Sequence, residues 1–198
     1  IRDSSTSRGL GDVYKRQKAS YCEESEGFPM ISAIVYTSNS GYTAEYARLL
    51  GRATGLPVND LRQVHTPQPD EEVIFLGWLM ADRVMGWPKA NAFFKVLAVC
   101  QVGMGPASAA AAAARKEKLG LADDCAVFAL QGGFDLHRLR GPYRLIMEVK
   151  CRQIKKQLEE KGALNPAQQL TYDMATKGAS AVCPENLQPV IDWYNSVK

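Results

Sequence analysis

The residues of this chain best suited to chemistry form one turn of short polar side chains around a glycine: Ser38, Asn39, Ser40, Gly41, Tyr42 and Thr43. Gly41 lets the backbone approach a ligand closely or take a positive φ. An apolar, β-rich run at residues 31–37 precedes the turn, and a helical pattern follows it. A strand that becomes a helix in this way aims free N–H groups and the positive helix end at one point. We therefore expect the turn to bind a phosphate, with helix capping by its small polar residues as the alternative.

The composition of the turn narrows the kind of phosphate. It contains no lysine, so it is not the G-x-x-x-x-G-K-[ST] loop of nucleoside triphosphatases. Neutral donors suit a terminal monophosphate better than a triphosphate with magnesium. The spacing Ser-x-Ser-Gly-x-Thr, placed between a first strand and a first helix, resembles the phosphate loop of flavodoxins, which bind flavin mononucleotide (FMN). This resemblance implies a flavodoxin-like fold with FMN as the cofactor.

Two later segments are candidates for the rest of a flavin site. Residues 73–77 predict a buried strand, and the loop expected after it is Trp78, Leu79, Met80, Ala81 and Asp82. Trp78 is expected either to stack on a flavin or to cover core beneath the loop. Asp82 either repels a reduced, anionic flavin or is simply solvated.

The segment Gly103, Met104 and Gly105 follows a strand predicted at residues 96–102. It lacks the third glycine of a dinucleotide-binding motif. It resembles the flavodoxin loop that covers the pyrimidine edge of the flavin.

The elements that must position these segments alternate regularly. Helices are expected from Thr43 to Gly55, at residues 88–94 and at residues 107–118, where alanines 109–114 should pack closely on a sheet. A short strand or extended edge begins at Val58, and a fifth strand covers residues 125–131. This alternation predicts an α/β, three-layer, doubly wound parallel sheet of five strands in the flavodoxin-like order 2-1-3-4-5, with ligands at the carboxyl ends of the strands.

The last third of the chain, residues 135–198, is expected to add helices to a core at 31–134. A basic loop leads into a helix at residues 143–161, in which Leu145, Val149, Ile154 and Leu158 are placed toward the core. Further helices are predicted from Asn165-Pro166 and at 184–197, where Pro189 breaks the first turns.

Residues 138–156 carry seven basic side chains against one acidic side chain, Glu148: Arg138, Arg140, Arg144, Lys150, Arg152, Lys155 and Lys156. This region is either a solvated basic face or a docking surface for an acidic redox partner, an anionic membrane surface or a carboxylated substrate.

The tail refines the resemblance. Cys125-Ala-Val, the glycine turn after that strand, and Tyr143-Arg-Leu-Ile-Met before a basic helix are similar to the menaquinone-dependent protoporphyrinogen oxidase-like branch of the flavodoxin-like proteins. This similarity implies electron transfer from a tetrapyrrole precursor toward a quinone. The segment between Val102 and Ala109 is shorter than the insertion of that branch.

Composition sets the outer limits. A chain of 198 residues with 46% hydrophobic residues predicts one globular domain, and its apolar runs are too short to span a membrane. A net charge of +3 does not indicate nucleic-acid binding. Five scattered cysteines without a C-x-x-C pair predict a reducing, cytoplasmic compartment, and with two histidines we expect no metal site.

Residues 1–17 resemble a translated sequencing-adapter read, and residues 18–29 are polar and expected to be disordered or untranslated, so Met30 is the predicted start.

Three functions remain open. The chain is an FMN-dependent electron carrier or oxidoreductase, an oxidase or dehydrogenase acting directly on a tetrapyrrole or quinone, or a flavin-free interaction module. No catalytic side chain is assigned.

Overall fold

The computed structural model describes residues 30–139 and 141–198; the expectations for residues 1–29 and for Arg140 lie outside these ranges. Its centre is a six-stranded, mostly parallel sheet in the order β2-β1-β3-β5-β6, with β4 paired to β3 off this path. The strands are β1 (Ala33–Tyr36), β2 (Val58–Asp60), β3 (Glu72–Met80), β4 (Arg83–Val84), β5 (Lys95–Gly103) and β6 (Ala126–Gln131). The α/β class with a parallel sheet, expected from the sequence, is confirmed.

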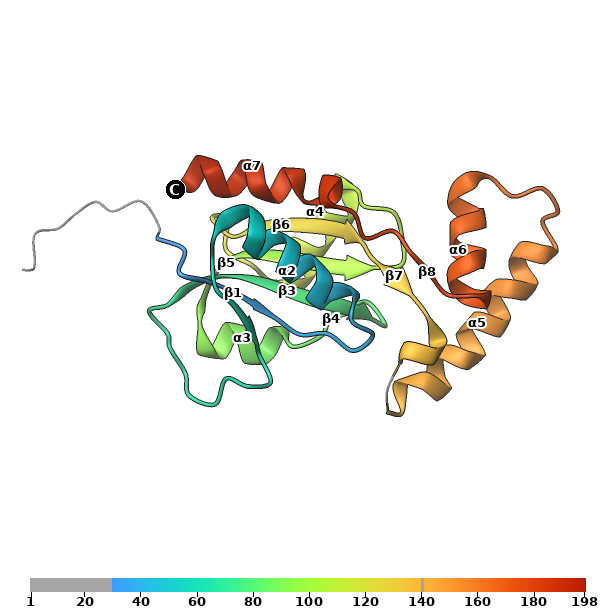
Figure 1. The fold of residues 1–198 in the computed structure, drawn as a ribbon, viewed down its shortest axis with the longest axis horizontal. Coiled ribbons are helices and arrows are strands. Elements are labelled where there is room, and N and C mark those ends of the chain that lie inside the picture. Colours follow the sequence, from blue (N-terminus) through green and yellow to red (C-terminus); the bar gives the residue numbers. More distant parts are fainter. Residues whose placement is uncertain (1–29, 140) are drawn as a thin grey trace, which may run out of the picture.

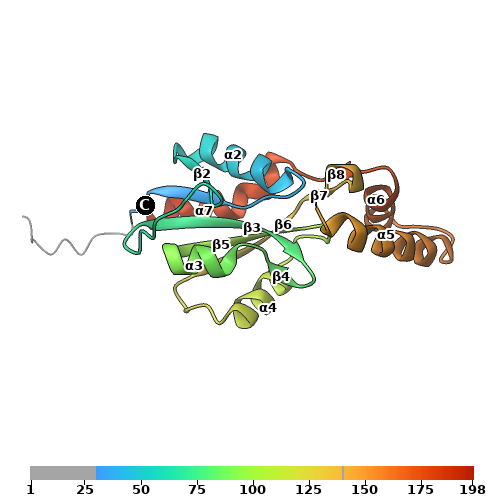
Figure 2. The same ribbon diagram turned by 90° about the horizontal axis from the view of Figure 1, so that it is seen from below.

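Helices cover both faces of this sheet, as Figure 2 shows. One face carries α2 (Tyr42–Thr54) and α7 (Gln188–Val197), and the other carries α3 (Trp87–Phe93) and α4 (Ala109–Leu119). Within the described ranges, no helix combines the length and the hydropathy that crossing a bilayer requires.

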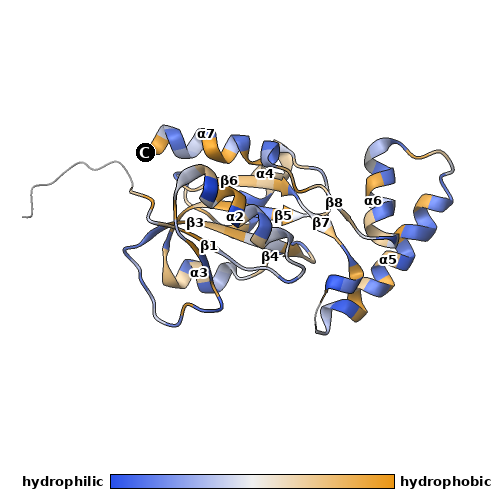
Figure 3. Cartoon of the chain, viewed as in Figure 1, coloured by the Kyte–Doolittle hydropathy of each residue, from blue (hydrophilic) through white to orange (hydrophobic). Residues whose placement is uncertain are grey.

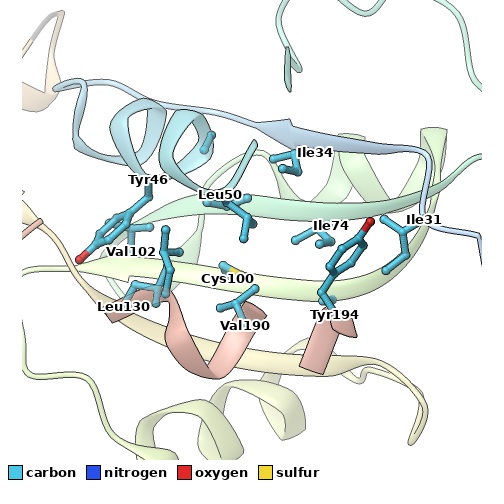
Figure 4. Packing of buried hydrophobic residues seen from close by; sticks show 14 residues of the cluster. Ile31, Ile34, Tyr46, Leu50, Ile74, Cys100, Val102, Leu130, Val190 and Tyr194 are labelled. Carbon is cyan, nitrogen blue, oxygen red and sulfur yellow. The ribbon is translucent and has the colours of Figure 1, made fainter. Parts of the chain in front are cut away.

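Strand side chains alternate between the two faces and so build two cores. Ile34 and Ile74 are fully buried against Leu50 of α2 and Val190 of α7 (Figure 4). Their strand neighbours, such as Phe75, point to the other face and pack with Ala90 and Phe94 at α3. The continuous apolar runs of the sequence follow from this burial on both sides.

The C-terminal part forms a lobe beyond the carboxyl ends of the strands (Figure 1). Its elements are β7 (Gly133–Phe134), the 3₁₀ turn η1 (Leu136–Arg138), α5 (Tyr143–Glu159), α6 (Pro166–Thr176) and β8 (Ala179–Ser180). A small separate core joins them, formed by Phe134, Leu139, Cys151 and Met174. The predicted start of α6 is confirmed, because Asn165 and Gln168 form a reciprocal capping box.

The chain then returns to the sheet through the 3₁₀ turn η2 (Pro184–Leu187) and α7, in which Pro189 lies in the first turn. Two hydrogen bonds fasten this return. The amide of Asn186 donates to the buried hydroxyl of Tyr46 at 2.6 Å, and that hydroxyl donates to the carbonyl of Gln131 at 2.6 Å.

Three sequence predictions about the elements are wrong. Trp78, Leu79 and Met80 are not in a loop, because β3 continues through them and pairs with the short antiparallel β4. The alanines of α4 are mostly exposed, and the buried residue of that helix is Arg115.

The third correction concerns α5. Leu145 and Val149 are exposed rather than directed toward the core, because the inward face of α5 is the one that carries Cys151 and Leu158. Of the predicted core positions of this helix, Leu158 is buried and Ile154 is half-buried.

Candidate functional site

The turn between β1 and α2 is a glycine turn that leads directly into the helix. Gly41 is the N-cap of α2, with a φ of 98° that favours glycine, and its N–H donates to the hydroxyl of Ser38 at 3.1 Å. The N-cap residue Gly41 has no side chain to cap the helix, and the N–H groups at the start of a helix are suited to binding an anion. Ser38 and Thr43 are buried at the base of this turn.

A cation that sequence reasoning assigned elsewhere lies beside the turn. Arg138, counted there with the docking region 138–156, stands over the ring of Tyr42 with its Cζ 4.8 Å from the ring centroid. Its Nη2 lies 3.8 Å from the position that a Cβ on Gly41 would take. Among the described residues, no carboxylate forms an ion pair with Arg138.

The local chain explains why Arg138 lies there. Asp135 accepts a hydrogen bond from the N–H of His137 at 2.8 Å and so begins the η1 turn directly after β7. Tyr42 packs against Gly133, where a Cβ would lie only 2.4 Å from its ring. Arg138 and His137 thus line a cavity of about 350 Å³ with Asn39, Ser40 and Gly41. The two glycines after the fifth predicted strand, Gly132 and Gly133, are the sequence feature that indicates this close contact with Tyr42.

The β3–β4 hairpin forms the second wall of the site. Ala81 and Asp82 connect the two strands with φ values of 46° and 65°, which is typical of a type I′ turn. Asp82 pairs with Lys118 and with Arg115, and the hydrogen bonds from these two cations lower the pKa of its carboxyl group. The sequence analysis expected Asp82 either to repel a reduced flavin or to be simply solvated. Its carboxylate is instead paired with two cations.

Arg115 holds this hairpin from beneath. Its side chain is 8% exposed; Nε donates to the Gln101 side chain at 2.7 Å, and the guanidinium also donates to the carbonyl of Asp82. The amide of Gln101 donates to the carbonyl of Ala111 at 2.9 Å. The network joins α4, β5 and the hairpin. Sequence analysis missed Arg115, since arginine in a helix is usually exposed.

The three predicted segments meet at the carboxyl ends of β1, β3 and β5. A cavity of about 60 Å³ is bounded by eight of the predicted site residues: Ser40, Tyr42, Thr43, Trp78, Leu79, Met80, Gly103 and Met104. Its remaining walls include Phe134, Leu139 and Met147 of the C-terminal lobe, which the sequence did not assign to the site.

A second, larger cavity lies beside the first and shares Trp78 with it. It measures about 610 Å³, and the predicted residues Ser38, Asn39 and Gly41 line it together with Arg48 and Tyr143. Ala81, Asp82 and Gly105 line neither cavity.

Trp78 is half-buried and borders both spaces. Its ring contacts Tyr143 edge to face, with centroids 5.3 Å apart and an interplanar angle of 85°. An aromatic pair therefore stands at the boundary of the two cavities, where the C-terminal lobe meets the sheet.

The phosphate end of this site fits FMN better than the ring end does. The N–H groups at the start of α2, the short hydroxyls and the guanidinium of Arg138, which forms no ion pair with a described carboxylate, are donors of the kind suited to a phosphate monoester. The 60 Å³ cavity is much smaller than the roughly 300–1,000 Å³ of small-molecule pockets. Leu139 and Met147 of the C-terminal lobe are among its walls, and the cavity as it stands is too small for a tricyclic ring.

Other parts of the molecule compete weakly as sites. A cavity of about 670 Å³ beside β6, between α4 and α7, is lined by small and apolar side chains, among them Phe128 and Trp193, and by the charged residues Lys116, Asp123 and Asp124. Within the described residues, no group of three or more His, Cys, Asp or Glu side chains is arranged to hold a metal.

Fold and site together define an α/β protein with a glycine turn, short hydroxyl side chains and Arg138 at the carboxyl edge of a mostly parallel sheet. No family model matches the chain, and no curated protein matches it either.

Proposed function

We propose that this chain is a flavodoxin-like redox protein that binds FMN and transfers electrons between a donor and an acceptor. The observation that carries the proposal is the convergence of residues 38–43, 78–80 and 103–104 at one edge of the sheet. Ligands of doubly wound sheets bind at that edge, near the point where the strand order reverses. Counted along the chain without β4, the five main strands lie in the order 2-1-3-4-5, which supports a flavodoxin-like arrangement.

The phosphate of FMN would be held by groups of two kinds. The N–H groups at the start of α2 and the hydroxyls of Ser40 and Thr43 donate neutral hydrogen bonds. Arg138 adds a charge-assisted bond from the opposite side of the turn. The sequence analysis considered neutral donors alone, and this proposal adds the charged donor Arg138 to them.

When bound, FMN supplies the redox chemistry, and the chain binds and orients it. Trp78, Gly103 and Met104 line the same cavity, and they would hold the flavin ring by an aromatic surface and by backbone groups. Phe134 and Leu139 of the lobe are buried and line this cavity, so they would form its apolar wall.

Two other functions each have one observation in their favour. Direct oxidation of a tetrapyrrole or quinone is favoured by the 610 Å³ cavity next to Trp78, which has the size of a small-molecule site and carries the exposed Arg48. A flavin-free interaction module is favoured by the narrow space at the ring position.

The test is a pair of titrations, with FMN and with riboflavin, which lacks the phosphate. Quenching of flavin fluorescence should give an affinity for FMN at least about ten-fold higher than for riboflavin. Arg138→Met should lower the FMN affinity by roughly ten- to a hundred-fold and leave riboflavin binding unchanged, because a hydrogen bond to a charged group contributes about 1.5–3 kcal/mol. Arg52→Met, at the far end of α2, is the matched control. A wild-type chain that binds neither flavin would refute the proposal and favour the interaction module.

A further inference from the structure

The first half of α5 exposes three aliphatic side chains to solvent. Leu145 is 69% exposed, Ile146 is 52% exposed and Val149 is 56% exposed. Among the described residues, Met30 is the one other large hydrophobic residue that is similarly exposed. At about 100° per residue the three side chains form one stripe, on the side of the helix opposite Cys151 and Leu158, which are buried in the lobe.

Basic side chains border this stripe. Lys150 lies on one side of it and Arg152 on the other, while α5 as a whole carries five basic and two acidic residues. Arg152 pairs with Glu148 at 2.6 Å within the helix. In the described part of the chain, Arg144 and Lys150 have no carboxylate partner. We call the three aliphatic residues together with Lys150 and Arg152 the α5 patch; Arg144 lies on the other side of the helix, near Cys151.

The patch is accessible in the fold. The lobe of α5 and α6 projects past the sheet, and α6 packs on the inner side of α5 (Figure 1). Figure 3 shows hydrophilic and hydrophobic residues interspersed along α5.

We propose that the α5 patch docks on an anionic lipid bilayer. Its aliphatic side chains would enter the boundary between headgroups and acyl chains, and its cations would meet the anionic headgroups. A second copy of the chain fits less well, because contact through this face would bring two positively charged helices together. A protein partner also fits less well, because the patch is convex and lacks the tryptophan and tyrosine side chains that dominate protein interfaces.

This orientation has a consequence for the candidate site. Helix α5 begins at Tyr143, which contacts Trp78 at the boundary of the two cavities. Docking would therefore place on the bilayer the helix whose first residue lines the 610 Å³ cavity. The proposal rests on the exposed residues of α5 and does not depend on the binding of FMN.

Vesicle flotation with the full chain tests the proposal. The chain should float with vesicles of phosphatidylglycerol and phosphatidylcholine, remain behind with pure phosphatidylcholine, and be released at about 1 M salt. Lys150→Gln should lower the partition coefficient roughly five-fold, since one cation near an anionic surface contributes about a factor of five. The double variant Leu145→Gln, Val149→Gln should lower it by about ten-fold or more.

Two control variants replace an exposed apolar side chain and an exposed cation outside the α5 patch: Met30→Gln and Lys177→Gln. Both should bind like wild type, and circular dichroism should be the same for every variant. The proposal is overturned if the wild-type chain does not float, if neutral vesicles bind it equally, or if the double variant binds like wild type. It is also overturned if gel filtration reveals a dimer that the double variant abolishes, because the patch would then join two copies.

Discussion

Replacing Arg115 by methionine tests how the β3–β4 hairpin is held. Methionine keeps most of the apolar stem and removes the guanidinium that joins Gln101 to Asp82. Gln101 is 2% exposed, so its side-chain oxygen would lose its donor without gaining water. Asp82 is exposed and keeps Lys118 as a partner, so it adds little to the loss.

The expected magnitude follows from the buried side of this network. A buried acceptor left without its donor costs about 1–3 kcal/mol, and a bond to a charged group lies in the upper part of that range. We therefore expect Arg115→Met to lower the free energy of unfolding by about 2–3 kcal/mol. Lys118→Gln removes the exposed partner of the same carboxylate and should leave the unfolding midpoint nearly unchanged.

Urea unfolding followed by circular dichroism measures both variants under the same conditions. A lower midpoint with an unchanged slope for Arg115→Met alone would support the reasoning. If the two variants unfold at the same urea concentration, the buried Arg115–Gln101 bond does not hold the hairpin, and the account of this wall of the site fails.

Three further outcomes are expected. Tyr46→Phe should lower the free energy of unfolding by about 1–2 kcal/mol, because Asn186 and a backbone carbonyl lose their shared partner; an unchanged urea midpoint would contradict this. Ala81→Gly should stabilise the chain by about 0.5–1 kcal/mol, because Ala81 has a φ of 46°; a lower melting temperature would count against the type I′ turn. Burial raises the pKa of the Cys125 thiol to about 11, so this thiol should not react near pH 8. Cys125→Ala should therefore leave the number of reactive thiols unchanged, whereas Cys183→Ala should reduce it, because Cys183 is only half-buried. The reverse pattern would contradict the assigned burial.

Much of the fold could be predicted from local patterns. The runs at 96–102 and 125–131 became β5 and β6 within about one residue, because strands buried on both faces are continuously apolar. Helix α2 begins one residue before its predicted start and ends at Gly55, whose φ of 76° terminates it.

The features that could not be predicted depend on distant partners. The length of β3 depends on the two-residue β4, which has no pattern of its own. The buried face of α5 is chosen by α6 and the lobe core, so spacing alone placed Leu145 wrongly. Arg138 was grouped with its basic sequence neighbours, whereas the η1 turn carries it back to Tyr42.

The site residues divide in the same way, into those predicted from a local pattern and those that depend on distant parts of the chain. The turn at residues 38–43 was recognisable because its side chains and its glycine act within one short segment. Phe134, Leu139 and Met147 were missed because their contribution requires a lobe that the core of the sheet does not predict. The residues of a loop can be recognised from one segment of the sequence, whereas the residues that pack opposite it come from distant segments.

The most direct test of the central claim is the absorption spectrum of the chain after incubation with excess FMN and gel filtration. The account predicts a yellow protein peak with about one FMN per chain, no retained riboflavin, and loss of the bound FMN in Ser40→Asp, because a carboxylate at the turn repels the phosphate. Ser196→Asp, on the exposed surface of α7, should retain FMN like wild type. A colourless wild-type peak, or a Ser40→Asp peak as yellow as wild type, would contradict the account.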